Sequence, residues 1–325
     1  MNKEKKNILS NGAVQTLLAS LFCILLGLVV GYIVLLAINP AGAGRAITAI
    51  LQNFLYFPRP EVALEYFGST LAKTAPLLMC TLSVLFAYKV GLFNIGASGQ
   101  YSVGAGLALY FGIHYNAPWW VCLIMAMLGG AVLGAVAGAL KAYLNVNEVI
   151  ACIMLNWISL YAVNTVLTEV KESGTTYTLP LRTNNPNALI PHLGLQHLFA
   201  DNRYVTIAIP LAVILAILVW VILDKTKLGY ELKATGLSIN AAKYAGMREK
   251  KNIILTMAIS GALAGLGAGF LYLCGIEQWS CAQTAVPNMG FNGIAAAFLG
   301  GIHPIGVSFF FILYPAYHQW WCICR

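Results

Sequence analysis

The chain has 325 residues, of which 59% are hydrophobic and only 9% are charged. A soluble globular chain carries roughly a quarter charged residues, so this composition excludes an ordinary water-soluble protein and indicates a membrane protein. The net charge of +8 does not indicate a nucleic-acid partner, because the Lys and Arg residues stand in short segments between apolar runs rather than along one face.

Apolar runs long enough to cross a bilayer as helices recur along the whole chain. The first is far longer than the roughly 7–15 apolar residues of a cleaved secretory signal, so we expect it to be retained. The sequence predicts an all-α polytopic protein with a single membrane domain over residues 1–325 and about eight transmembrane helices. The predicted spans are Val14 to Ile38, Thr70 to Ala87, Leu92 to Ile113, Trp119 to Leu140, Val149 to Leu167, Tyr204 to Leu223, Ile253 to Cys274, and Asn288 to about Tyr314.

Basic residues between the spans predict the orientation. With the N-terminus inside, twelve Lys and Arg residues fall in cytoplasmic segments and only five in outer ones. This asymmetry follows the positive-inside rule and predicts both ends in the cytoplasm. The long segment 169–203 is then an extracytoplasmic loop, and the basic segment 224–252 is a cytoplasmic loop.

The segment from Gly91 to Gln100 places polar side chains at membrane depth. Glycines surround Asn94, Ser98 and Gln100, and a continuous helix tolerates Gly poorly, at a cost of up to about 1 kcal/mol each relative to Ala. Polar groups at this depth usually face a bundle interior or an aqueous path. We expect a broken or re-entrant segment that lines a cavity; the alternative is a loosely packed helix start at the cytoplasmic surface.

Two predicted helices carry glycine at four-residue spacing, which permits close helix packing in lipid. The glycines are Gly130, Gly134 and Gly138 in one helix and Gly261, Gly265 and Gly269 in the other.

Further polar candidates stand at the starts of two later spans. Glu148 and Asn156 lie about 80° apart around a helix and can share a broad face. Asn292 lies one turn inside the run that begins at Asn288, which itself can cap the helix. Glu148 has an equally simple interpretation as the acidic cytoplasmic end of its span.

The cytoplasmic loop contains a predicted short helix from Ile239 to Ala245. Ser238 can cap its start and Gly246 can end it. Its small residues would allow close approach of a soluble partner; the alternative is a solvated linker.

No G-x-x-x-x-G-K-[ST] sequence occurs in the chain, so any ATP dependence must come from a partner. Hydrolase motifs are also missing from the sequence, and we expect no enzyme activity. Cys322 and Cys324 form a close pair, but C-x-C without further ligands is a weak metal signal, and we expect no metal site.

Four ordered motifs carry a resemblance to a known family. They are Gly91 to Gln100, Asn147 to Asn156, Glu231 to Gly246 and Met289 to Gly301. Together they resemble the permease subunits of ABC importers in the branched-chain amino-acid and simple-sugar permease superfamily. The sequence is most similar to the nucleoside-type permeases that work with basic membrane protein lipoproteins.

The resemblance implies a type II ABC importer-like permease with a broken helix near residues 91–106, in the bacterial cytoplasmic membrane. It implies a separate ABC ATPase that binds the ATP, a second and different permease, and an extracytoplasmic solute-binding lipoprotein; it implies no cofactor in this chain. The translocation-path candidates are Asn94, Ser98, Gln100, Glu148, Asn156 and Asn292, of which Glu148 rests on its position alone. The ATPase-coupling candidates implied by the resemblance are Asn240, Ala241, Ala242, Tyr244, Ala245 and Gly246.

The tail, residues 307–325, departs from the family pattern, in which one or two further apolar helices follow. We interpret it as the product of a truncated gene or a shifted reading frame. The leading hypothesis is import of a nucleoside or a similar small polar solute. The alternatives are a permease for a monosaccharide or a branched-chain amino acid, an ion-coupled secondary transporter, and a scaffold subunit.

Overall fold

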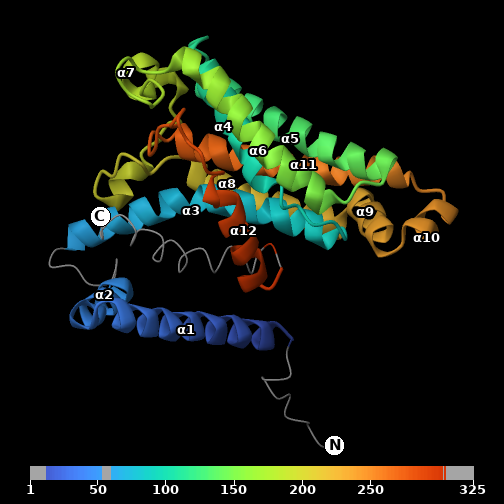
Figure 1. The fold of residues 1–325 in the computed structure, drawn as a ribbon, viewed down its shortest axis with the longest axis horizontal. Coiled ribbons are helices and arrows are strands. Elements are labelled where there is room, and N and C mark those ends of the chain that lie inside the picture. The colour runs from blue at the N-terminus through green and yellow to red at the C-terminus, as the bar shows by residue number, and fades with distance from the viewer. Residues whose placement is uncertain (1–11, 53–59, 303, 305–325) are drawn as a thin grey trace, which may run out of the picture.

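A computed structural model describes residues 12–52, 60–302 and 304 of the chain, and it is built from helices (Figure 1). Within these ranges the β structure is limited to two isolated bridges, Lys171 with Thr178 and Tyr177 with Ser280. The predicted all-α polytopic class is confirmed. The tail at 307–325 lies outside the described residues.

In the part of the chain that the structure describes, six helices are long and apolar enough to cross a membrane. They are α1 (Gly12–Ile38), α3 (Pro60–Lys89), α5 (Trp119–Leu144), α6 (Glu148–Leu167), α8 (Ala208–Lys225) and α11 (Glu249–Tyr272). Two other predicted spans contain shorter helices, α4 (Ala97–Ile113) and α12 (Asn288–Leu299), and the end of the last span lies outside the described residues. The described residues therefore contain six candidate crossings, and the count of eight stays a prediction.

Helix α1 differs from the others because its described side chains are almost all exposed. It contacts α2 (Pro40–Gln52), and Figure 1 shows the two at one side of the bundle. A helix that is apolar on every side and uncovered by protein is suited to lipid.

Helices α5 and α11 make the most extensive contact in the bundle, α4 packs against both of them, and α3 packs against α11. Helix α6 packs on α4, α8 packs on α3, and α12 packs on both α3 and α4.

The predicted glycine stripes account for the close approach of α5 and α11. A Cβ atom on Gly130 would collide with the carbonyl oxygen of Gly261, and one on Gly134 would collide with that of Met257. The structure thus confirms the predicted close packing at these glycines.

The two long loops also contain short helices. The segment between α6 and α8 holds α7 (Leu181–Asn184) and the 3-10 turns Thr168–Val170, Pro186–Ala188 and Leu195–Phe199. The segment between α8 and α11 holds α9 (Lys227–Leu237) and α10 (Ile239–Tyr244). Figure 1 shows α10 reaching past the ends of α5 and α11.

Candidate functional site

The connection between α3 and α4 is a buried, non-helical segment. Helix α3 ends at Lys89, Gly91 has a positive φ of 78°, and helical structure resumes only at Ala97. Residues from Ala97 to Ile113 then form one continuous helix. Of the range 91–106 in which we predicted a broken helix, residues 91–96 are therefore non-helical, and residues 97–106 belong to the continuous helix α4.

A buried polar network joins this connection to three helices. The side-chain amide of Asn94 donates to Gln100 Oε1 at 2.8 Å and to Ser260 Oγ at 2.6 Å, and Gln100 Nε2 donates back to Asn94 Oδ1 at 3.2 Å. Ser260 Oγ donates to the carbonyl of Ser83 at 2.8 Å. All four residues are at most 1% exposed. Because unpaired polar groups are costly in such surroundings, the network fixes the connection relative to α3, α4 and α11.

Asn156 on α6 holds the first turn of α4. Its Oδ1 accepts from the backbone N–H of Gly99 at 2.9 Å, and its Nδ2 donates to the carbonyl of Ile95 at 3.1 Å. The N-cap of α4 is Gly96, which has no side chain to satisfy the free N–H groups of a helix start. A neighbouring helix therefore supplies the cap. A Cβ atom on Gly99 would lie 2.7 Å from Asn156 Oδ1, so glycine is needed at that contact.

The other path candidates are Ser98, which lies in the first turn of α4 but outside this network, and Asn292 and Glu148, which lie on other helices. Ser98 is fully buried, its hydroxyl has no hydrogen-bond partner among the described residues, and Gly290 of α12 packs closely against it. Asn292 is half-buried on α12. Glu148 bonds to Lys141 Nζ at 2.9 Å, which ties the adjoining ends of α5 and α6. The structure thus brings Asn94, Gln100 and Asn156 together around the start of α4, and their role in a path stays a prediction.

The network also contains two residues that the sequence interpretation missed. Ser83 and Ser260 are single hydroxyl residues inside apolar runs of α3 and α11. The available signal was that Ser260 directly precedes a glycine of the α11 stripe, where helices approach closely.

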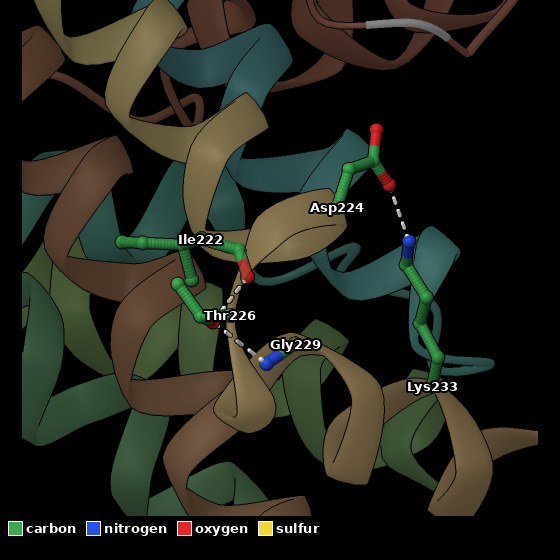
Figure 2. Close-up of polar contacts among 5 residues, drawn as sticks. All are labelled: Ile222, Asp224, Thr226, Gly229 and Lys233. Atoms are coloured by element: carbon green, nitrogen blue, oxygen red, sulfur yellow. Dashed lines mark hydrogen bonds and ion pairs between the residues drawn. The ribbon is translucent and has the colours of Figure 1, made fainter.

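The α8–α9 junction is held by side-chain contacts (Figure 2). Thr226 Oγ1 donates to the carbonyl of Ile222 at 2.6 Å and accepts from the N–H of Gly229 at 3.1 Å, so Thr226 caps α9 while it is bonded to α8. Lys233 on α9 donates to Asp224 on α8. These contacts set the direction in which α9 leaves the bundle.

Helix α10 has the predicted caps. The N–H of Ala241 donates to Ser238 Oγ at 3.2 Å, and Gly246 has the positive φ of 77° that follows a helix end. The helix ends at Tyr244, one residue before the predicted end. The exposed coupling candidates are Asn240, Ala241, Tyr244, Ala245 and Gly246.

Ala242 differs from the other coupling candidates, because only 2% of it is exposed and its methyl group packs inward. Two apolar residues that were not singled out, Leu237 and Ile239, are exposed beside Tyr244, which is 94% exposed. Contact of this tip with an ATPase stays a prediction.

Two contacts connect the α9–α10 segment to the buried network. Asn252 on α11 donates to Thr235 Oγ1 on α9 at 2.8 Å. Gly91 lies against Gly236 so closely that a Cβ atom on Gly91 would be 2.8 Å from the Gly236 carbonyl oxygen. The end of α9 therefore touches the same connection that carries Asn94.

A polar pocket of about 350 Å³ opens at the opposite end of the bundle, near the tops of α4 and α11. Its lining includes Arg182, Arg203, Glu277 and the ring of Tyr204, over which the Arg182 guanidinium lies at 5.5 Å. Charged and aromatic groups around one opening suit small polar solutes.

Apolar helices, a buried polar break and a short helix projecting from one end define a polytopic membrane transport protein. Comparison with known sequences specifies this class. The model of the family described as branched-chain amino acid transport system / permease component matches residues 66–321, and the chain belongs to that family.

Several curated relatives resemble most of the chain. The guanosine ABC transporter permease protein NupP of Bacillus subtilis is 34% identical over 295 residues, covering 90% of this chain and 81% of the relative. The nucleoside ABC transporter permease protein NupB of Lactococcus lactis is 33% identical, covering 94% of this chain and 83% of the relative. The glucose ABC transporter permease protein TsgB13 of Haloferax volcanii is 30% identical, covering 78% and 70%. No solved structure gives a significant match.

Proposed function

We propose that this chain is the membrane-spanning permease subunit of an ATP-binding cassette importer for nucleosides or related small polar solutes. The observation that carries the proposal is the identity of 34% and 33%, over most of the chain, to permeases named for guanosine and for nucleosides. The exposed α10 and the polar pocket near Arg182 fit such a role. The permease itself catalyses no covalent reaction.

In the proposed importer, α10 docks into a separate ATPase subunit, which binds the ATP. The chain forms half of the path with a second, different permease, and a solute-binding lipoprotein delivers the solute from outside. The excess of basic residues in the segments around α9 and α10 supports a cytoplasmic position for this end and for the N-terminus.

Movement of α10 reaches the bundle through α9. ATPase closure displaces α10, and α9 transmits the displacement through Thr235 to Asn252 and through Gly236 to Gly91. The non-helical connection that carries Asn94 then shifts relative to α4. Alternating access follows when the packed helices exchange one discrete arrangement for another.

A substitution at Ala241 tests the coupling step. Ala241→Glu places a charge on the exposed face of α10, and we expect ATPase association to fall about thirtyfold, as when a central interface contact of about 2 kcal/mol is lost. Uptake of labelled guanosine by cells that carry the full importer should fall with it. Ala242 is unsuitable for this test because its burial would make a charge destabilise the fold.

Two controls separate the possible outcomes. Ala285→Glu makes the same change at an exposed residue in the α11–α12 connection, and it should leave ATPase association unchanged. Wild-type association and uptake by the Ala241→Glu protein would refute the coupling role. Import of glucose but not guanosine by the wild-type complex would refute the substrate class, and uptake that needs only a proton gradient would refute the ABC mechanism.

A further inference from the structure

A second pocket, of about 660 Å³, lies between α9, the α10–α11 connection and the first two turns of α11. Three basic residues, Lys227, Arg248 and Lys251, line it together with one carboxylate, Glu231. Apolar side chains complete the wall, which reaches Leu255 in the second turn of the α11 span. The pocket lining therefore combines basic residues with apolar ones.

Only some of the charged residues that line the pocket have an ion-pair partner. Lys227 Nζ lies 3.8 Å from Glu231 Oε1, and nearby Lys141 and Lys233 each bond to a carboxylate. Arg248 and Lys251 are exposed and make no ion pair with any residue in the described part of the chain. Two uncompensated cations thus face one opening, which favours an anionic ligand.

The pocket lining also contains apolar side chains and one buried polar residue. Asn252, which follows Lys251 directly on α11, is 6% exposed and donates to Thr235 Oγ1 on α9, so its side chain is held in place. Leu228 and Met247 contribute apolar side chains beside it. Inorganic phosphate alone would leave this apolar wall uncovered, whereas a phosphate that carries a glycerol and acyl chains would cover it.

We infer that this pocket binds the phosphate headgroup of an anionic phospholipid. Arg248 and Lys251 hold the phosphate oxygens, and the glycerol end of the lipid packs toward Leu255. Ala245 and Gly246, which directly follow α10, also line the pocket. The bound headgroup therefore braces the base of α10, so the anionic lipid content of the membrane sets how firmly that helix is held.

Lipid titration of the full-length chain tests the inference. The chain is purified in mild detergent and titrated with fluorescent phosphatidylglycerol, with phosphatidylcholine as the uncharged comparison and inorganic phosphate as a competitor. The variant is Arg248→Gln with Lys251→Gln. We expect its phosphatidylglycerol binding to weaken about fivefold per charge removed, since a basic residue near an anionic surface contributes about 1 kcal/mol.

The matched control removes two exposed cations that do not line the pocket, in Lys89→Gln with Lys243→Gln. It should keep wild-type binding, and size-exclusion profiles should show all three proteins folded. Equal preference for phosphatidylglycerol in all three proteins would overturn the site. Saturation by inorganic phosphate with no preference for phosphatidylglycerol would overturn the lipid as its source. Loss of ATPase binding with unchanged lipid binding would assign the pocket to the partner protein instead.

Discussion

Replacing Asn94 by Ala tests whether the buried network stabilises the bundle. The Asn94 amide has two protons, and its nearest acceptors are Ser260 Oγ at 2.6 Å and Gln100 Oε1 at 2.8 Å. Ser260 remains satisfied after the change, because it also donates to the carbonyl of Ser83. The Gln100 side chain loses its partners, since both of its hydrogen bonds are to Asn94, and water does not replace them because Gln100 is only 1% exposed.

The expected loss of stability follows from these two orphaned groups on Gln100. Hydrogen bonds between transmembrane helices average about 0.6 kcal/mol, whereas a buried unsatisfied group costs about 1–3 kcal/mol. For two groups, the free energy of unfolding should fall by about 1–6 kcal/mol. The double variant Asn94→Leu with Gln100→Met replaces both partners by apolar residues of similar shape. It should regain most of the lost free energy of unfolding, because no unpaired polar group remains on either side chain.

Unfolding in mixed detergent micelles, followed by far-ultraviolet circular dichroism, measures this free energy. The matched control is Asn292→Ala, which removes the same atoms from a half-buried side chain that makes no hydrogen bond to a described residue. Its loss should be smaller than that of Asn94→Ala. Equal losses in the two variants, or no recovery in the Asn94→Leu, Gln100→Met protein, would refute the stabilising role of the network.

Two glycine positions give further predictions. Gly130→Val should destabilise the bundle by about 1–3 kcal/mol in the same unfolding assay, because its Cβ meets a carbonyl of α11. The control, Gly31→Val on α1, has open space around it and should be close to wild type in stability. Equal destabilisation by the two substitutions would contradict close packing at Gly130. Gly91→Ala should reduce guanosine uptake because its Cβ displaces Gly236. Gly174→Ala is the control, since Gly174 also has a positive φ but has open space around it. A similar loss of uptake in both variants would show that backbone strain alone is responsible.

Most of the helices could be predicted from the sequence because a bilayer requires long apolar runs. The predicted start of α3 was the least accurate, since the helix begins at Pro60 and the predicted span began at Thr70. Glu61 and Glu65 lower the apolar character of this stretch, yet a proline at the first position and an acidic first turn both favour a helix start. Hydropathy therefore located the more apolar part of α3 and missed its polar N-terminal extension.

The candidate site was only partly predictable, because its contacts are long-range. Asn94 and Gln100 are six residues apart, so their common segment was visible in the sequence. Their partner Ser260 lies 166 residues from Asn94, and the relevant geometry depends on how α11 packs against α3. The 100° rule placed Asn156 on a helix face but could not show that this face meets the uncapped start of α4.

The contact between Gly91 and Gly236 connects these observations. Each glycine alone predicts a turn or a close approach, and neither identifies its partner. Their contact places the end of α9 against the connection that carries Asn94, while α10 continues directly from α9. Because a side chain on either glycine would separate the two backbones, a shift of α9 requires the connection to move or the contact to break. The proposed coupling therefore depends on a backbone contact, which sequence patterns of side chains do not record.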